Sequence, residues 1–512
     1  MPLTSGKRAF LEILKQEGVE YLFGNPGTTE LPLMDGLVEE PALTYVLGLQ
    51  EAAVVAMADG YAQASGKLGV VSVHVAPGLG NALGMLYDAQ KAGAPLLVTA
   101  GQHDQSFNVT EPILWADLPP IARPFVKWSA EVRRLEDLPR LVRRAAKTAL
   151  APPSGPVFLS LPADVLQAEG AVELGAATRV APRIRGDREA VEAAAETLAR
   201  AERPLILAGD AVAQSDAHAE LVQVAEALGA PVYAEGVANT ASFPSSHPLF
   251  RGALARVAPA VRQLLLDADV LFSVGGDLLT LSLPFDVDPM PPGLEVIHLD
   301  IDPWELGKNY PTGVAILGDP KATLPEILAA IEARMTPARR QQARERLLAN
   351  RAAKSRQVEE LRTRARAEAQ RTPITPLAVM SAVADALPSE AVVVDESISS
   401  GGGLRVLLRS DDPRSFYGLR GGGIGWGLPA AIGVKLALPD RPVVALVGDG
   451  SAMYTCQALW TAAHYRVDVV FVLLNNASYR ILKQRIHALK GFAAQADRFI
   501  AMDLDDPRID FV

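Results

Sequence analysis

The chain has 512 residues, of which 49 % are hydrophobic and 21 % are charged, and its formal net charge is −10. This length predicts two to four domains rather than a single core. The acidic balance argues against nucleic acid as a main partner, because phosphate backbones are bound by basic faces. No apolar run reaches the roughly 18 residues that span a bilayer, so no membrane partner is expected.

The chain contains one cysteine, Cys456, which excludes an internal disulfide and a cysteine-based metal cluster. This fits a reducing compartment. The N-terminus lacks the apolar block of a signal peptide, so we expect a cytoplasmic protein. We expect Cys456 to fill a core position inside a helix.

In chain order, helical and strand-like patterns alternate in three series, which are separated first by a proline-rich stretch and then by a charged one. Strands that alternate with helices indicate βαβ units and a mainly parallel sheet. The predicted fold class is therefore α/β, with three doubly wound parallel-sheet domains. We place these domains at residues 1–182, 186–335 and 373–512.

The segment 336–372 between the second and third series changes composition abruptly, because Arg, Glu, Gln and Ala dominate and aromatic residues are absent. Interleaved charges on helix-forming residues predict a solvated helical linker. A nucleic-acid-binding arm is the alternative, and the acidic residues mixed into the segment argue against it.

Polar residues follow two strand-like runs of the third domain. Asp449 lies in Gly-Asp-Gly-Ser after one apolar run, and Asn476 ends the next one 27 residues later. At the carboxyl ends of neighbouring parallel strands, the two side chains would lie side by side. Their oxygens, together with glycine backbone and a helix N-terminus, suit a divalent metal that holds a diphosphate.

This pair of motifs at this spacing resembles the cofactor-binding signature of thiamine-diphosphate enzymes. More closely, GDGSAMYTCQALWTAAHY and GGGIGWGLPAAIG resemble the benzoylformate decarboxylase branch of the acetolactate synthase-like 2-oxo acid decarboxylases and carboligases. The similarity runs from about Phe10 to the last residue and is weakest in the middle. It implies pyrimidine-binding, central and diphosphate-binding domains, and a carboxy-lyase or carboligase that acts on a small 2-oxo acid.

The resemblance also implies which residues hold thiamine diphosphate and its Mg²⁺, or Ca²⁺ in its place; FAD is not expected. The metal ligands would be Asp449, the side chain of Asn476 and the backbone carbonyl of Ser478. The residues beside the diphosphate would be Ser399, Gly450, Ser451 and Tyr479. Ile424 would hold the cofactor bent, with Pro26, Gly423 and Gly425 also against it.

Three residues of the first domain match catalytic positions of the resembling enzymes. Glu51, at the start of a helix, matches the glutamate that bonds the cofactor's pyrimidine and promotes its imino form. His74, at a strand's carboxyl end, matches a histidine that moves protons. Thr28 replaces a serine of benzoylformate decarboxylases, and its hydroxyl would bind the substrate carboxylate. Further residues expected along the substrate site are Asn25, Asn81, Ile113 and Leu114.

Glu51 and Asp449 lie in different predicted domains, yet both would contact one cofactor. In the resembling enzymes the glutamate domain comes from the neighbouring subunit. The resemblance therefore implies a homodimer or homotetramer with its active site at the subunit interface.

The sequence departs from the resembling families in three places. No histidine occurs from Ser273 to Ile297, where benzoylformate decarboxylases carry a second catalytic histidine, so the substrate stays open. Leu482 stands where pyruvate decarboxylases have a glutamate, which argues against that activity. The family continues for another helix and strand after the last residue here. We therefore expect a diphosphate-binding domain that is short at its C-terminus, through truncation or because the last strand is supplied differently.

Three alternatives remain. An acetolactate synthase-type carboligase is the nearest, although enzymes of the FAD-containing type continue differently after the two motifs. A non-catalytic homologue that binds the cofactor is the second, and the retention of Glu51 and His74 argues against it. A nicotinamide or flavin oxidoreductase is the third, and no G-x-G-x-x-G motif follows the strands of the central domain.

Overall fold

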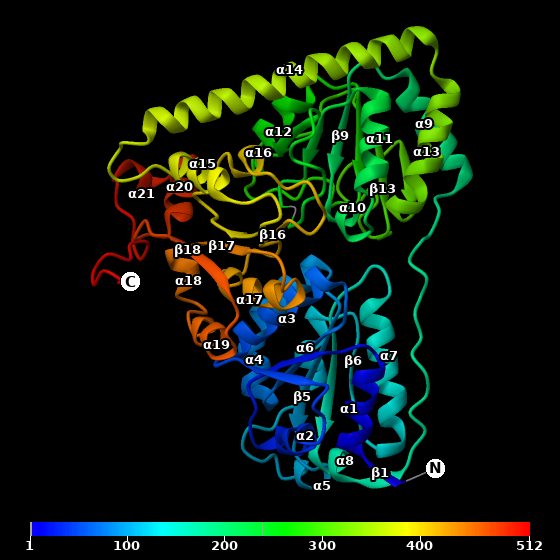
Figure 1. Cartoon of the computed structure of the whole chain (residues 1–512), viewed down its shortest axis with the longest axis vertical. Coiled ribbons are helices and arrows are strands. Elements are labelled where there is room, and N and C mark those ends of the chain that lie inside the picture. The colour runs from blue at the N-terminus through cyan, green and yellow to red at the C-terminus, as the bar shows by residue number, and fades with distance from the viewer. Residues whose placement is uncertain (1–2, 238, 512) are drawn as a thin grey trace. The chain divides into compact units, whose positions relative to one another are not determined.

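The structure, a computed structural model, describes residues 3–237 and 239–511. The chain divides into two compact units, of which the first comprises Met1–Val180, Val393–Ile398 and Leu419–Val512. The second comprises Ala181–Val392 and Ser399–Gly418. Both contain parallel strands connected by helices (Figure 1), which confirms the predicted α/β class.

The N-terminal part of the first unit contains a six-stranded parallel sheet in the order β3-β2-β4-β5-β7-β6. Its strands are β2 (Tyr21–Gly24), β3 (Thr44–Leu47), β4 (Gly69–Val73), β5 (Leu96–Gln102), β6 (Ser129–Glu131) and β7 (Val157–Pro162). The chain runs from β2 to β3 on one side and then to β4 on the other. Such a switch of direction opens a crevice at the carboxyl ends of the two strands, β2 and β4.

Helices and two short strands complete this part. They are β1 (Leu3–Ser5), α1 (Gly6–Gln16), α2 (Leu31–Leu37), α3 (Glu51–Ser65), α4 (Val75–Ala92), α5 (Gln105–Asn108), α6 (Leu118–Ala122), α7 (Leu138–Leu150), α8 (Ala163–Gln167) and β8 (Glu169–Ala171). Helix α1 shows how the sequence sets these boundaries. The Ser5 side chain accepts from the backbone of Arg8 at its start, and Phe10, Leu11 and Leu14 are buried on one face.

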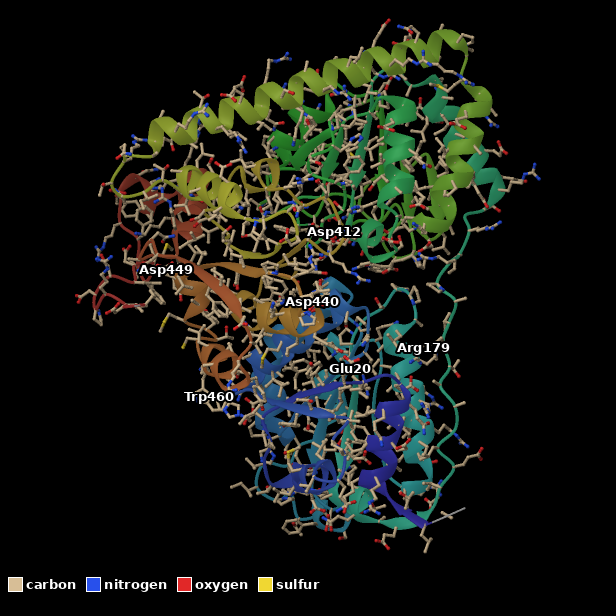
Figure 2. All side chains as sticks on the ribbon, in the orientation of Figure 1. Glu20, Arg179, Asp412, Asp440, Asp449 and Trp460 are labelled. Carbon is tan, nitrogen blue, oxygen red and sulfur yellow. The ribbon has the colours of Figure 1, made fainter. Side chains whose placement is uncertain are left out.

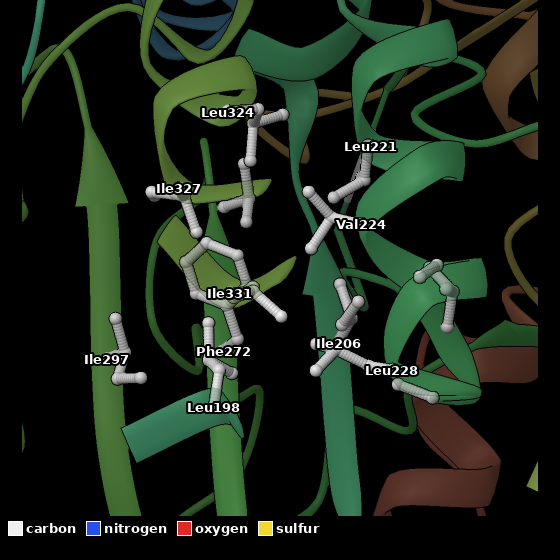
Figure 3. Close-up of a cluster of buried hydrophobic side chains, with 14 of the residues drawn as sticks. Leu198, Ile206, Leu221, Val224, Leu228, Phe272, Ile297, Leu324, Ile327 and Ile331 are labelled. Carbon is white, nitrogen blue, oxygen red and sulfur yellow. The ribbon is translucent and has the colours of Figure 1, made fainter. Parts of the chain in front are cut away.

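The second unit contains a six-stranded parallel sheet in the order β11-β10-β9-β12-β13-β14. Its elements are α9 (Arg188–Arg200), β9 (Pro204–Ala208), α10 (Asp210–Gln214), α11 (His218–Leu228), β10 (Val232–Ala234), β11 (Phe250–Ala253), α12 (Ala258–Leu265), β12 (Val270–Val274), β13 (Glu295–Asp300), β14 (Val314–Leu317) and α13 (Pro320–Arg334). Figure 3 shows Ile206 and Phe272 of the sheet packed between side chains of α11 and α13 such as Val224 and Ile327.

The charged segment after this sheet forms one helix of 32 residues, α14 (Pro337–Glu368), which agrees with the helical character predicted from its composition (Figure 1). The Thr336 side chain accepts from the backbone of Arg339, and Pro337 occupies the first turn, where its missing N–H costs no hydrogen bond. The helices α15 (Pro376–Ala386) and α16 (Leu404–Leu407) follow.

The third sheet has the order β16-β15-β17-β18. Its elements are β15 (Val392–Glu396), β16 (Phe416–Gly418), α17 (Gly427–Ala437), β17 (Val443–Gly448), α18 (Asp449–Ala452), α19 (Ala458–Tyr465), β18 (Val469–Leu474), α20 (Arg480–Leu489) and α21 (Phe492–Gln495). Strands β17 and β18 are parallel and paired from Val443↔Val469 to Gly448↔Leu474. Asp449 and Asn476 therefore follow the paired ends of neighbouring strands, as predicted.

Helices α3 and α17 pack against each other through glycines within the first unit. A Cβ on Gly60 would lie 2.2 Å from the carbonyl oxygen of Ala430, and one on Gly433 would lie 1.9 Å from that of Met57. Only glycine permits this approach, which fixes α3, and Glu51 at its first position, against α17.

One expectation about the fold is wrong. Cys456 does not fill the core; it lies exposed in the turn between α18 and α19, because the helix that was expected to run through it is interrupted there. None of the helices in residues 3–237 and 239–511 has the length and apolar character needed to cross a membrane.

Candidate active site

The crevice between β2 and β4 brings His74 next to the segment 25–30. His74 directly follows β4 and precedes α4, and Gly27 lies so close that a Cβ there would be 2.2 Å from the imidazole ring. The next residue, Val75, is buried and has φ 41°, which is rare for a β-branched residue and costs about 1–3 kcal/mol. Strain of this kind gathers where backbone is held for function.

The His74 ring is held by two residues that the sequence reasoning missed. Its Nδ1 lies 2.8 Å from Glu30 Oε2 and 3.1 Å from Thr29 Oγ1. Glu30 is only 2 % exposed, and its hydrogen bond with the ring raises the pKa of His74 above its usual value. The sequence did hold a signal for Glu30, because a glutamate three residues after Gly27 is placed to bond the backbone at the start of a helix.

The other predicted residues of this segment are more accessible. Pro26 and Thr28 are exposed and Asn25 is half-buried, so the Thr28 hydroxyl is free to face a ligand from solvent. Ile113 and Leu114 lie in an exposed loop, with Leu114 at φ 74°.

Glu51 begins α3 and is 8 % exposed. The Gln50 side chain caps this helix by accepting from Ala53 N, which fixes where the helix starts. Asn81 Nδ2 donates to Glu51 Oε2 at 3.0 Å, and a Cβ on Gly78 would lie 3.3 Å from Oε1. Asn81, expected along the substrate, thus holds the Glu51 carboxylate in one orientation.

The second group of predicted residues lies at the carboxyl ends of β17 and β18, where Figure 2 labels Asp449. Asp449 Oδ2 and Asn476 Oδ1 are buried and have no hydrogen-bond partner among the described residues. Two hard oxygens without donors fit a divalent cation. The carbonyl of Ser478 accepts from Arg480 N at 2.8 Å and keeps a second lone pair.

Within the described residues, no group of three or more His, Cys, Asp or Glu side chains could hold a metal. A cation at Asp449 and Asn476 would therefore need oxygens from a bound ligand and water, which is how Mg²⁺ is held with substrate phosphates. The residues Gly450 and Ser451 lie in α18, and a Cβ on Gly450 would be 2.6 Å from the Tyr479 ring. Ser399 belongs to the second unit.

The glycine-rich segment around Ile424 is held by buried carboxyl groups that sequence reasoning also missed. Glu396 accepts from Gly425 N at 2.7 Å and from Gly427 N at 2.6 Å, and Asp88 accepts from Gly423 N at 3.0 Å. Burial raises the pKa of Glu396 to about 7 and that of Asp88 to about 8. Ile424 itself is half-buried.

Two glycines of this segment are also required by the packing and backbone conformation of the chain itself. A Cβ on Gly423 would lie 2.7 Å from Asp88 Oδ2, and Gly425 has φ 102°, a conformation that other residues rarely adopt. The segment is therefore rigid and presents Ile424 in one place.

Comparison with known proteins identifies the chain's relatives. Models of thiamine pyrophosphate enzymes match along it: the N-terminal TPP binding domain at residues 4–113, the central domain at 191–327 and the C-terminal TPP binding domain at 401–512. The chain is 34 % identical to the benzoylformate decarboxylase of Pseudomonas aeruginosa, over 98 % of this chain and 90 % of that protein.

Two further relatives agree with this. The chain is 30 % identical to the acetolactate synthase isozyme 3 large subunit of Escherichia coli, over 94 % of this chain and 84 % of that protein. The solved structure of the thiamine diphosphate-dependent 4-hydroxybenzoylformate decarboxylase of Rhodococcus jostii matches with a TM-score of 0.85 at 32 % identity, covering 99 % of this chain and 92 % of that one. This chain therefore belongs to the thiamine pyrophosphate (thiamine diphosphate) enzymes and is an enzyme of the branch that contains these decarboxylases and carboligases.

Proposed function

We propose that this enzyme catalyses the non-oxidative decarboxylation of a 2-oxo acid with thiamine diphosphate and Mg²⁺, in the manner of benzoylformate decarboxylase. The observation that carries the proposal is the pair of buried oxygens without donors, Asp449 Oδ2 and Asn476 Oδ1, at the ends of paired strands. Leaving such an acceptor unsatisfied costs about 1–3 kcal/mol, which a bound cation offsets.

The residues that would hold the cofactor are those the sequence suggested. Asp449, Asn476 and the Ser478 carbonyl would hold Mg²⁺. The diphosphate would lie by Ser399, Gly450, Ser451 and Tyr479, and the rings by Pro26, Gly423, Ile424 and Gly425. The chemistry that thiamine diphosphate supplies when bound is an electron sink for the carbon–carbon bond that breaks as carbon dioxide leaves.

Glu51 and His74 would handle the protons. Glu51, oriented by Asn81, would share a proton with the pyrimidine ring nitrogen. Replacing carbon dioxide by hydrogen to give an aldehyde consumes one proton per turnover, and His74, whose pKa is raised, would donate it. The exposed Thr28 hydroxyl would bind the substrate carboxylate, and Asn25, Ile113 and Leu114 would lie along the rest of the substrate.

Carboligation of the acetolactate synthase type is the second candidate reaction. The chain has no histidine from Ser273 to Ile297. The nearest one, His298, is fully buried on β13 with its Nε2 2.9 Å from the Gly276 carbonyl. With fewer groups to deliver the proton that completes the aldehyde, the carbon that has lost carbon dioxide would more often form its new bond to the carbonyl carbon of an aldehyde or of a second 2-oxo acid.

We also propose a cytoplasmic homodimer or homotetramer whose active site combines Glu51 of one subunit with Asp449 of another. Intersubunit complementation tests this directly. Mixing inactive Glu51→Gln and Asp449→Ala subunits, with reversible dissociation, should restore about one quarter of the sites if each site draws on two subunits. No recovery after verified subunit exchange would contradict a shared site.

The experiment that tests the function combines binding and turnover. Thiamine diphosphate with Mg²⁺ should raise the melting temperature of the purified protein, whereas either one alone should do so less. Carbon dioxide release should then be measured across aromatic, branched and short 2-oxo acids, with product analysis for aldehydes and for 2-hydroxyketones. Absence of any stabilisation would refute the cofactor site, and stabilisation without turnover of any 2-oxo acid would favour the non-catalytic homologue.

A further inference from the structure

We propose that Glu30 is a positioning residue that fixes the His74 ring in one orientation and one tautomer, so that Nε2 is the nitrogen that exchanges protons with the substrate. The role of His74 rests on the proposed function. The assignment of Glu30 rests on geometry in the described residues.

The carboxylate of Glu30 is itself rigid. Its Oε1 accepts from Gly101 N at 2.8 Å and from Thr29 Oγ1 at 2.9 Å, and its Oε2 accepts from Gly27 N at 2.9 Å. The two backbone N–H groups can only donate, so both oxygens must act as acceptors, as in an ionised carboxylate. The side chain is 2 % exposed and comes from the 3-10 turn Thr28–Glu30, which faces β5.

The hydrogen bond between Glu30 Oε2 and His74 then determines which nitrogen of the imidazole carries the hydrogen. Where the Glu30 carboxylate is ionised, Oε2 can only accept, so His74 Nδ1, 2.8 Å away, carries the hydrogen and donates it. The neutral ring therefore has its lone pair on Nε2, and the protonated ring has a second N–H there. The side chain of His74 is 20 % exposed.

The ring cannot easily turn away from this arrangement. Gly27 packs against it so closely that a Cβ would lie 2.2 Å from two ring atoms, and Val75 after it is held at φ 41°. In other enzymes too, a carboxylate bonded to one nitrogen of a histidine orients the ring and leaves the other nitrogen available as the base.

The two carboxylates near His74, those of Glu30 and Glu51, both raise its pKa. Glu30 lies behind the ring, and the Glu51 carboxylate also raises the pKa of His74, while burial lowers it. Tyr45 lies beside β2, and burial, together with the charge of Glu30, raises the pKa of its hydroxyl, so it stays neutral. With no histidine in the central segment 274–297, the proton supply depends more heavily on this one ring.

The first test follows His74 by NMR in the cofactor-free protein, with ¹⁵N- and ¹³C-labelled histidine and His74→Asn to assign its signals among the seven histidines. We expect a pKa above 6.5 and, in the neutral ring, a proton on Nδ1. Glu30→Gln should lower that pKa. A wild-type His74 that titrates at or below 6.5, or carries its neutral-state proton on Nε2, would overturn the proposal without any variant.

The second test is a kinetic double-mutant cycle. Glu30→Gln should lower kcat by about 10- to 100-fold with a smaller change in KM, and shift the pH profile with the His74 pKa. In the His74→Asn background the same change should have no further effect, because Glu30 acts through the ring. Glu30→Asp should recover part of the rate, and the exposed Glu39→Gln should leave it unchanged.

Effects of Glu30→Gln and His74→Asn that multiply would show a purely structural role and refute the proposal. The two tests also separate its failure from that of the proposed function. If the wild-type protein turns over no 2-oxo acid, the function fails, while the NMR measurement alone still decides whether Glu30 sets the state of His74.

Discussion

Replacing Asp449 with alanine should have opposite effects on the cofactor-free and the cofactor-bound protein. Asp449 is 3 % exposed, and its Oδ2 has no partner among the described residues. Removing such an acceptor relieves about 1–3 kcal/mol of desolvation. Its charge at the start of α18 contributes only about 0.3–1 kcal/mol in return. The free energy of unfolding of the cofactor-free variant should therefore be unchanged or higher by up to about 2 kcal/mol.

The stabilisation by ligand should disappear in the same variant. At a concentration 100 times the dissociation constant, thiamine diphosphate with Mg²⁺ should stabilise the wild type by about 2.7 kcal/mol. Of the residues assigned to the metal, only Asp449 has an ionisable side chain. The variant would therefore lack any charged protein ligand for the metal. Urea midpoints with and without the ligands measure both effects.

Asp210 provides the matched control, because it is a buried aspartate whose carboxylate already accepts hydrogen bonds from groups of the protein. It accepts from Asn239 N at 3.0 Å, Thr240 N at 3.0 Å and Thr240 Oγ1 at 2.7 Å. Asp210→Ala should destabilise the cofactor-free protein by about 2–5 kcal/mol, since it leaves buried donors without an acceptor. An Asp449→Ala variant that loses stability as Asp210→Ala does, or that keeps the full ligand stabilisation, would refute the metal site.

Three further outcomes follow from particular contacts. Glu51→Gln should lower kcat by about 100-fold or more while cofactor affinity, measured by calorimetry, changes only a few-fold; a variant as fast as the wild type would contradict its proton role. Gly433→Ala should destabilise the protein by about 1–3 kcal/mol or more, because its Cβ would lie 1.9 Å from the Met57 carbonyl oxygen. Gly84→Ala, a helix glycine with open space around it, should instead stabilise it by about 0.5–1 kcal/mol, and equal urea midpoints for the two variants would refute the packing argument. Burial raises the pKa of Asp88 from 3.8 to about 8, so the folded chain keeps a proton there that the unfolded chain releases, and stability falls as pH rises from about 4 to 8. Asp88→Asn should flatten that fall between pH 5 and pH 8 in urea denaturation; an unchanged slope would show that Asp88 is not its source.

Local signals carried most of what the sequence could predict. Apolar runs followed by Gly-Asp-Gly-Ser and by Asn-Asn marked two strand ends, and pairing of β17 with β18 up to Gly448↔Leu474 brings those ends together. The charge pattern of the linker likewise predicted α14. These features depend on neighbours in sequence, so periodicity and turn chemistry suffice for them.

Contacts between residues that are far apart in the sequence could not be predicted from it. Glu30 meets His74 across 44 residues because β2 and β4 are adjacent in the sheet, an order that the sequence does not state. Asp88 meets Gly423 across 335 residues. The expectation for Cys456 was wrong for a related reason, since the helix was expected to run on from the Gly-Asp-Gly-Ser motif, whereas α18 ends at Ala452.

Helix α4 shows how one element relates the separate groups. His74 occupies its N-cap position, Asn81 donates to Glu51, and Asp88 accepts from Gly423 N. Successive members of this set are seven residues apart, which places them on one face of the helix about 10 Å from one another. A rigid helix face thus connects, within one subunit, the groups assigned to proton transfer and to the pyrimidine with the segment that presents Ile424. Because the proposed site takes Glu51 and Asp449 from different subunits, these groups of one chain would belong to two different sites, and a kink in α4 would disturb both.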